Sequence, residues 1–318
     1  MRYSHSCAFY EQAGTVGLAR RGYRRENHLS TTTESWLVGL IGDGITASLT
    51  PPMHEREARE NGLQYLYRPV DLSVNGRSGT EVGDLLRYGR DLGFNAFNIT
   101  HPCKQLVLEH LDEVSDDAAR LGAVNTVLVT DSGFIGHNTD HSGFGRALSA
   151  GLPGAALEKV VQLGAGGAGA AVAYALLKAG VSALTLVDLD PGRVQERVQA
   201  LSTLFPEASV TSGTSADLPG LLAAADGFVQ ATPVGMHSHP GMPVDASLLR
   251  PEMWVADVIY RPVRTQLIDT AEALGCRVLD GGYMAVGQAV DAFELITGIR
   301  PDSARMRAHF LEMVNSGL

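Results

Sequence analysis

Short runs of apolar residues alternate with segments of helical periodicity along most of this chain. Runs of about four to eight apolar residues bounded by Gly, Pro or Asn predict buried strands, and apolar positions spaced three and four apart predict helices. We expect strands over residues 36–42, 63–70, 94–100, 160–163, 184–187, 208–210, 227–230, 255–259 and 277–279, and a hairpin-like pair over 123–129 and 134–136. We expect helices over 50–62, 81–92, 101–111, 170–179, 192–204, 216–224, 285–296 and from about 303, with a loop over 71–79. This order predicts an α/β fold in which one α/β unit precedes another.

Residues 159–190 carry the most informative pattern: a strand, a glycine-rich turn, an Ala-rich helix and a second strand. The turn reads Gly164-Ala165-Gly166-Gly167-Ala168-Gly169. In dinucleotide-binding units such glycines permit a tight turn, close approach of the backbone to a pyrophosphate, and close packing of the helix on the strand. Asp188 ends the second strand, where a carboxylate can accept a hydrogen bond from a ribose 2′-hydroxyl.

A glycine-rich turn can also connect a strand to a helix without binding anything. Here the preceding strand, the following helix and the distance to the acid all agree, so the pattern favours a Rossmann-type, doubly wound nucleotide domain. Its pyrophosphate would lie at the helix N-terminus, and the expected cofactor contacts in this segment are Gly164, Gly166, Gly167, Ala168 and Asp188.

The composition describes an ordinary globular protein. The 318 residues suffice for two domains with full cores, and 45% hydrophobic and 19% charged residues lie outside the disordered range. The net charge of −10 and the lack of a long basic run argue against nucleic acid and anionic membrane surfaces as partners. No apolar run reaches the ~20 residues needed to span a bilayer.

The first 35 residues show little periodicity and are expected to form a flexible extension. Their scattered charges and the lack of an apolar centre argue against a secretory signal. The three cysteines, Cys7, Cys103 and Cys276, are far apart and odd in number, so we expect reduced thiols and a cytoplasmic protein.

Ser48 and Thr50 precede the first predicted helix. Thr50 followed by Pro51 is a helix-start signal, with the threonine hydroxyl as the cap and proline at the first helical position. In an extended segment, residues two apart share a face, so both hydroxyls and the helix N-terminus could bind a carboxylate without an arginine. A purely capping role for Thr50 is the alternative, and the two roles are compatible.

Two histidine pairs raise the question of a metal site, and we expect none. His137 and His141 would share a face only in a helix, and Asn138-Thr139-Asp140 followed by Ser142-Gly143 is a poor helix sequence. His237 and His239 lie in a Pro/Gly-rich loop with no third ligand nearby in the sequence.

A series of short motifs over about residues 37–318 resembles the shikimate/quinate dehydrogenase family. The motifs are Ser48-Leu49-Thr50-Pro51, Asn98-Ile99-Thr100-His101-Pro102-Cys103-Lys104-Gln105, Gly122-Ala123-Val124-Asn125-Thr126, Asn138-Thr139-Asp140, Gly164-Ala165-Gly166-Gly167-Ala168, Ala231-Thr232-Pro233-Val234-Gly235-Met236 and Gly287-Gln288-Ala289. The resemblance implies a split α/β substrate domain completed by the C-terminal helices, with the nucleotide domain inserted. We expect boundaries at 36–136 for the first part of the substrate domain, 137–284 for the nucleotide domain and 285–318 for the returning helices.

The resemblance also implies roles for single residues. Lys104 would transfer the proton of the reacting hydroxyl, and Asp140 would orient Lys104 and bind a substrate hydroxyl. Amides and hydroxyls suit a polyhydroxylated ring, although satisfying backbone groups is the alternative for any one of them. The implied substrate contacts are Ser48, Thr50, Thr100, Asn125, Asp140, Tyr260 and Gln288, and Thr232 and Met236 join the cofactor contacts.

The chain departs from the family's common pattern at Thr50, His141 and Gln230, where Ser, Gly and Asn are usual. The Ser-x-Thr pattern and Asp188-Leu189-Asp190, where NADP-using relatives commonly have Asn-Arg-Thr, resemble the NAD-dependent quinate/shikimate branch. We therefore expect an NAD-dependent enzyme, monomeric or homodimeric, that interconverts quinate or shikimate with the 3-dehydro acids. An NADP-dependent biosynthetic shikimate dehydrogenase and a non-catalytic dinucleotide-binding sensor are the alternatives.

Overall fold

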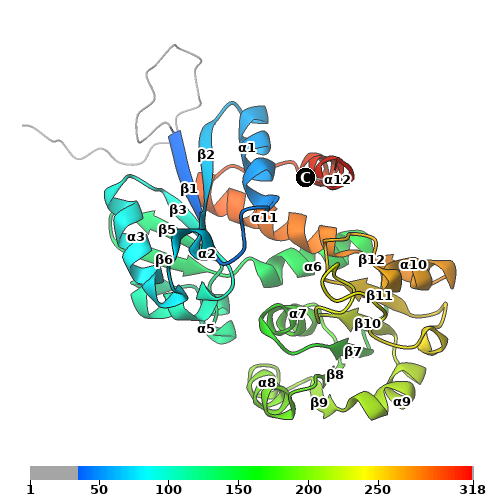
Figure 1. Ribbon diagram of the computed structural model, residues 1–318. Helices are drawn as coiled ribbons and strands as arrows, with labels where there is room; N and C mark the ends of the chain where they lie inside the picture. The colour runs from blue at the N-terminus through cyan, green and yellow to red at the C-terminus, as the bar shows by residue number, and fades with distance from the viewer. Residues whose placement is uncertain (1–34, 317–318) are drawn as a thin grey trace, which may run out of the picture.

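The computed structural model describes residues 35–316, which form two lobes, each built around a six-stranded sheet. The first lobe contains the N-terminal sheet and the second contains the sheet that follows it in the chain (Figure 1). The predicted extension over residues 1–35 lies outside the described residues except for Ser35, which begins the first strand.

The first sheet is mixed. Its strands are β1 (Ser35–Gly42), β2 (Gln64–Asp71), β3 (Ala96–Ile99), β4 (Glu113–Val114), β5 (Thr126–Thr130) and β6 (Gly133–His137), in the order β2-β1-β3-β5-β6-β4. β1 pairs in parallel with both β2 and β3, and the β5–β6 pair is antiparallel, as the hairpin pattern predicted. The carboxyl ends of β1 and β3 therefore lie at one edge, where the first polar motifs begin.

The helices of this lobe are α1 (Thr50–Glu60), α2 (Leu72–Asn75), α3 (Val82–Asp91), α4 (Cys103–Leu106) and α5 (Asp116–Leu121), with 3₁₀ turns η1 (Gly79–Glu81) and η2 (Val107–His110). The loop prediction over 71–79 was wrong in part, because Asp71 ends β2 and α2 follows directly. The helix predicted over 101–111 ends as an α-helix at Leu106 and continues as a 3₁₀ turn.

The second sheet is wholly parallel and contains β7 (Lys159–Leu163), β8 (Ala183–Val187), β9 (Ser209–Gly213), β10 (Gly227–Gln230), β11 (Trp254–Asp257) and β12 (Arg277–Leu279). The order β12-β11-β10-β7-β8-β9 reverses between β7 and β10, which makes this a doubly wound sheet whose ligand crevice lies at that switch point. α7 (Gly167–Lys178) and α8 (Pro191–Leu204) pack into one core, and α9 (Leu218–Ala223) and α10 (Gln266–Ala273) into another that contains other residues of the sheet. The predicted Rossmann-type architecture is confirmed.

The sequence pattern did not predict α2, α5, α6 (Asp140–Gly151) or α10, and of these α6 contributes to the site described below. α6 begins at Asp140, so the expectation of a poor helix was wrong from Asp140 to Gly143, whereas Asn138 and Thr139 precede the helix and His137 ends β6. α6 packs against α11 (Gly281–Thr297), and a Cβ added at Gly143 would lie 2.4 Å from the backbone nitrogen of Gln288. The glycines that lower helix propensity are what let the two helices approach, so tertiary packing overrides propensity here.

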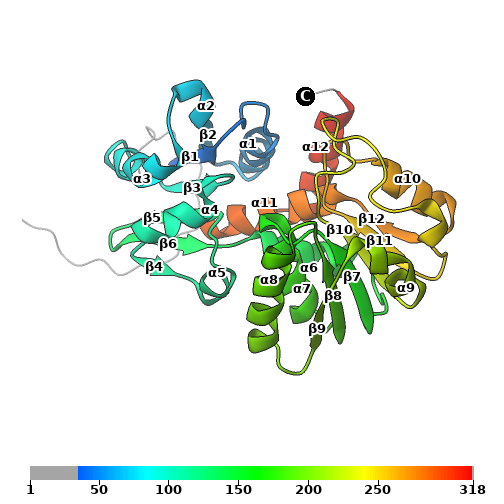
Figure 2. The same ribbon diagram turned by 60° about the horizontal axis from the view of Figure 1, so that its bottom comes forward.

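The two C-terminal helices return to the first lobe, as Figure 2 shows for α11, which passes between the lobes. Phe293 of α11 stacks on Tyr65 of β2 with ring centroids 5.8 Å apart. α12 (Ser303–Asn315) docks on α1 through Arg305, whose Nη2 lies 2.5 Å from Oε1 of the fully buried Glu57. No helix within residues 35–316 has the length and apolar character to cross a membrane.

Candidate active site

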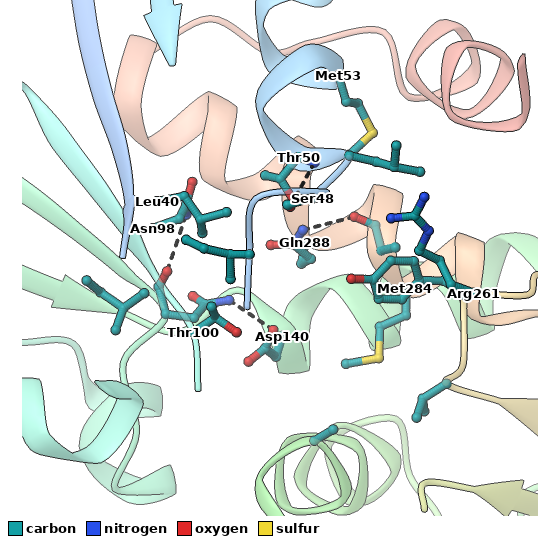
Figure 3. Close-up of a pocket in the computed structure, with 18 of the residues that line it drawn as sticks. Leu40, Ser48, Thr50, Met53, Asn98, Thr100, Asp140, Arg261, Met284 and Gln288 are labelled. Carbon is teal, nitrogen blue, oxygen red and sulfur yellow. Dashed lines mark hydrogen bonds between the residues drawn. The ribbon is translucent and has the colours of Figure 1, made fainter. Parts of the chain in front are cut away.

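A cavity of about 390 Å³ lies where the two lobes meet (Figure 3). Its walls come from the loop after β1, helix α1, the end of β3, helix α4, the first turn of α6, the start of α7, the loop after β11, and helices α11 and α12. Every predicted catalytic and substrate residue lines it: Ser48, Thr50, Thr100, Lys104, Asn125, Asp140, Tyr260 and Gln288. Of the predicted cofactor contacts, Ala168 lines it as well.

Lys104 and Asp140 form an ion pair in this cavity, with 2.5 Å between Lys104 Nζ and Asp140 Oδ2. The other carboxylate oxygen of Asp140 accepts a hydrogen bond of 3.0 Å from Asn125 Nδ2. The Asn125 side chain is itself fixed, since its Oδ1 accepts from the backbone nitrogen of Thr139 at 2.8 Å. The ammonium is thus held by a carboxylate whose own position is fixed by a buried amide.

The Ser48–Thr50 segment differs from the prediction in detail. Leu49, not Thr50, is the N-cap of α1; it has helical backbone angles, and no side chain caps the helix. Ser48 Oγ accepts a bond of 3.3 Å from the backbone nitrogen of Thr50. The capping role proposed for Thr50 and the extended conformation were therefore wrong, because the chain already turns at Leu49. Both hydroxyl-bearing residues nevertheless line the cavity.

Asp71 holds the loop that carries Ser48. Its carboxylate accepts hydrogen bonds from the backbone nitrogens of Gly44 and Thr46, at 3.1 and 2.9 Å, and from the Thr46 hydroxyl at 2.7 Å. The bond from that hydroxyl, with the others, holds the pKa of Asp71 well below its ordinary value. The loop after β1 is thereby tied to the end of β2 at neutral pH.

The sequence did not indicate several residues of the cavity wall. Arg261, beyond β11, reaches across to the first lobe, where its Nη1 donates a 2.6 Å bond to the carbonyl oxygen of Ala47. Met53, Met284 and Phe310 supply apolar surface from three different helices (Figure 3 shows the two methionines). Lone methionines and arginines in helices and loops carry no local motif, so the sequence offers no signal for these residues.

The glycine-rich turn has the form expected of a dinucleotide site. Gly164 has φ +104°, and a Cβ there would lie 2.5 Å from the carbonyl oxygen of Ala231, so the loops after β7 and β10 pass in contact. A Cβ added at Gly166 or Gly167 would meet nothing within 4 Å, so both glycines border open space at the N-terminus of α7. Unpaired backbone N–H groups there suit a pyrophosphate. The side chain of Gln162, which the sequence analysis did not single out, stabilises the turn by donating to the carbonyl oxygens of Gly164 and Gly169, each at 2.8 Å.

Asp188 stands beside that turn. Its Oδ2 accepts from the backbone nitrogen of Ala165 at 2.7 Å, and its Oδ1 lies 3.4 Å from Nη1 of Arg193. Burial alone would raise the pKa of Asp188, but the backbone hydrogen bonds and Arg193 hold it below its ordinary value. Arg193 also lies 3.3 Å from Asp190, so two carboxylates share one guanidinium at the end of β8.

Thr232 and Met236 lie in the loop after β10, at the switch point. Gln230 organises that loop, because its Nε2 donates to Thr232 Oγ1 at 2.8 Å and to the carbonyl oxygen of Val234 at 2.7 Å. Neither Thr232 nor Met236 lines the cavity that contains Lys104. These two predicted cofactor contacts therefore lie outside that cavity, at the carboxyl end of β10 in the second sheet. Within the part of the chain that the structure describes, no three His, Cys, Asp or Glu side chains come together as a metal site would require.

Comparison with known proteins agrees with this geometry. A family model described as the shikimate dehydrogenase substrate binding domain matches residues 40–127. A protein of Pseudarthrobacter chlorophenolicus named shikimate dehydrogenase (NADP(+)) is 63% identical over 286 residues, which are 90% of this chain and 98% of that relative. The chain belongs to the shikimate dehydrogenase family.

Other members of the shikimate dehydrogenase family carry a different cofactor in their names. A Corynebacterium efficiens protein named quinate/shikimate dehydrogenase (NAD(+)) is 50% identical, over 88% of this chain and 99% of that relative. The structure of quinate dehydrogenase from Corynebacterium glutamicum in complex with NAD superposes with a TM-score of 0.84 at 48% identity, covering 87% of this chain and 99% of that one. The chain is therefore an oxidoreductase of this family with a nicotinamide dinucleotide cofactor, and the relatives' names do not agree on which one.

Proposed function

We propose that this protein is an NAD-dependent dehydrogenase that interconverts quinate or shikimate with the corresponding 3-dehydro acid. The observation that carries the proposal is the Lys104–Asp140 ion pair, which lies in a cavity that also borders Ala168 of the glycine-rich turn. A proton-transfer pair and a dinucleotide turn on one cavity are what oxidation of a ring hydroxyl needs.

Each group has a distinct task in this proposal. The bound nicotinamide supplies hydride acceptance or donation, and the chain supplies proton transfer and positioning. Lys104 Nζ takes the proton of the hydroxyl during oxidation and returns it during reduction, and Asp140 orients Lys104 and binds a ring hydroxyl. Ser48 and Thr50 bind the carboxylate. The remaining polar contacts to the ring come from Thr100, Asn125, Tyr260 and Gln288.

NAD preference rests on the charges at the end of β8. Asp188 and Asp190 share Arg193, which leaves one negative charge in excess where the adenosine ribose would lie. A 2′-phosphate would be repelled there, and the guanidinium of Arg193 is already bound to the two acids. The relative at 63% identity is named for NADP, so an NADP-dependent shikimate dehydrogenase is the second candidate.

Activity on quinate as well as shikimate rests on Thr50. The two acids share the carboxylate and three ring hydroxyls, and quinate adds a hydroxyl on the carbon that bears the carboxylate. The methyl group of Thr50 restricts its χ1 and so fixes the direction of its hydroxyl at that end of the ring. A site that hydrogen-bonds the extra hydroxyl accepts quinate.

The test is a four-way assay of the purified protein with quinate or shikimate and with NAD or NADP, followed by the absorbance of the reduced nicotinamide. We expect turnover of both acids with NAD and far lower kcat/KM with NADP. Turnover of shikimate with NADP alone would replace this proposal with the second candidate, and no turnover in any combination would leave a dinucleotide-binding protein without this activity.

A further inference from the structure

A buried hydroxyl on the edge strand of the first sheet is connected to the proposed catalytic pair. Tyr67 of β2 is fully buried, and its hydroxyl donates a short hydrogen bond to Oδ1 of Asn98 on β3. The His54 and Tyr67 rings pack nearly perpendicular to each other, with centroids 5.1 Å apart. Burial and the neighbouring Tyr65 raise the pKa of the Tyr67 phenol well above its ordinary value, so the group remains a donor at any working pH.

From Asn98 the hydrogen bonds continue in one direction. Asn98 Nδ2 donates to Thr126 Oγ1 at 2.9 Å, and the Thr126 hydroxyl donates to Asn125 Oδ1 at 3.1 Å. Asn125 Nδ2 then donates to Asp140 Oδ1 at 3.0 Å, and Lys104 donates to the other oxygen of that carboxylate. We call these five residues, Tyr67, Asn98, Thr126, Asn125 and Asp140, the donor chain. All five are buried.

The inference depends on the direction of donation. An amide can be turned over, which exchanges its donor and its acceptor, and only its neighbours decide between the two orientations. Two groups orient the Asn98 amide: the Tyr67 hydroxyl donates to its Oδ1, and the backbone carbonyl oxygen of Asn125 accepts from its Nδ2 at 3.3 Å, so Nδ2 faces Thr126. Thr126 then receives a proton from Asn98 and is left to donate its own to Asn125.

We propose that Tyr67 is a positioning residue for the dehydrogenase reaction, a proposal that rests on the roles given to Lys104 and Asp140. Its hydroxyl helps to fix the orientation of the Asn98 amide, which reaches the carboxylate of Asp140 through Thr126 and Asn125, and the backbone nitrogen of Thr139 orients Asn125 as well. Tyr67 does not line the cavity, so it acts through other residues and touches no substrate.

Removing the hydroxyl leaves two arrangements. Asn98 can keep its orientation with a buried oxygen that has lost its donor, which is costly in a low-dielectric interior. Alternatively it turns over, and its oxygen then faces Thr126, which donates to Asn98 and no longer to Asn125. In the first arrangement the bonds beyond Asn98 remain but lose the polarisation that the Tyr67 bond provided, and in the second the Thr126–Asn125 bond is lost. In both, Asn125 keeps its bond from the backbone nitrogen of Thr139, but the carboxylate beside Lys104 is held less firmly.

The chain offers a matched control. Tyr65 lies on the same strand two residues before Tyr67, is also buried, and its hydroxyl pairs with Nδ1 of His54 at 3.2 Å, outside the donor chain. Tyr67→Phe and Tyr65→Phe each remove one buried hydroxyl from β2. We expect Tyr67→Phe to lower kcat about tenfold with an unchanged Kd for NAD, and Tyr65→Phe to keep kcat within about twofold. The solvent deuterium isotope effect on kcat should rise in Tyr67→Phe alone, because proton transfer becomes slower.

Thr126→Val interrupts the donor chain at its third residue, and it tests the proposal independently if Tyr67→Phe does not fold. It should also lower kcat, and the Tyr67→Phe/Thr126→Val double variant should lose no more than the worse single variant. Equal losses in Tyr67→Phe and Tyr65→Phe, additive losses in the double variant, or wild-type turnover in Thr126→Val would each overturn the proposal. Lys104→Ala is measured in the same assay. If this variant stays active, the catalytic roles proposed for Lys104 and Asp140 are wrong. If Lys104→Ala is inactive and Tyr67→Phe is fully active, only the role of Tyr67 is refuted.

Discussion

Replacing Asp190 by Asn is expected to relax the preference for NAD while leaving the fold intact. Asp190 is the N-cap of α8, where its Oδ1 accepts from the backbone nitrogen of Arg193 at 3.1 Å. Asparagine caps a helix as well as aspartate does, so the substitution removes a charge and keeps the cap. It also leaves Arg193 with a single carboxylate partner, Asp188, in the cluster at the end of β8.

The magnitude follows from Coulomb's law. A unit charge ~5 Å from a phosphate charge costs about 3 kcal/mol at an effective dielectric near 20 and about 1 kcal/mol in bulk water. The Asp190 side chain is 50% exposed, so the lower part of that range applies. Relief of about 1–2 kcal/mol corresponds to a gain of roughly 5- to 30-fold in kcat/KM for NADP. The value for NAD should change by less than about twofold, since the ribose contact is assigned to Asp188.

The assay compares kcat/KM for NAD and NADP at fixed quinate in the wild type and two variants. Asp226→Asn is the control, because it removes the same charge at the opposite edge of the sheet, where Asp226 accepts from the backbone nitrogen of Lys159 at the start of β7. The gain for NADP should appear in Asp190→Asn and not in Asp226→Asn. An unchanged cofactor ratio in Asp190→Asn, or the same change in both variants, would refute local repulsion as the cause of the preference.

Three further predictions concern substrate choice, pH and stability. Thr50→Ser should shift the quinate-to-shikimate ratio of kcat/KM toward shikimate by roughly tenfold, because a serine hydroxyl without the neighbouring methyl group can rotate and no longer favours quinate. An unchanged ratio in initial-rate assays would contradict the role of the methyl group. Burial raises the pKa of Asp257 from 3.8 to about 6, so the folded chain binds the extra proton and stability is lost as pH rises from about 4 to about 6. Relative to the wild type, Asp257→Asn should therefore gain up to ~3 kcal/mol in unfolding free energy between pH 4 and pH 7 in urea titrations, and a pH-independent difference would show that Asp257 does not titrate in this way. Arg305→Met should lower the free energy of unfolding, measured by urea denaturation, by about 3–5 kcal/mol, because Glu57 stays buried without its cation. Adding Glu57→Gln should recover much of that loss. A loss below about 1 kcal/mol would mean that this ion pair does not hold α12.

The parts of the fold that could be predicted from the sequence are those in which local pattern and burial agree. The strands Gly227–Gln230 and Arg277–Leu279 match their predicted bounds because short apolar runs beside turn residues have few alternatives in a parallel sheet. The glycine turn was also readable, because each glycine has a backbone reason to be there.

The parts that could not be predicted are set by contacts between distant segments. α11 begins at Gly281, four residues earlier than expected, because Asp280 caps it by accepting from the backbone nitrogen of Gly282. Asp-Gly-Gly suggests a turn when it is considered alone. The position of Arg261 over Ala47 depends on how the two lobes meet, which no local pattern records.

The candidate site was predictable only through its motifs. Lys104 and Asp140 are 36 residues apart, and neither spacing nor periodicity indicates that their side chains meet. The resemblance to a family supplied that pairing. It did not supply Tyr67 or Gln162, whose roles come from hydrogen bonds that form only in the folded chain.

The central claim is that Lys104 transfers the proton in NAD-dependent oxidation, and Lys104→Ala tests it most directly. The measurement is kcat for quinate and shikimate oxidation with NAD, together with the Kd for NAD from nicotinamide fluorescence titration. We predict a loss of about 10²–10⁴ in kcat with an unchanged Kd, because Lys104 belongs to the first lobe and the glycine turn to the second. A variant that keeps half of the wild-type rate, or that loses NAD binding together with turnover, would contradict the account.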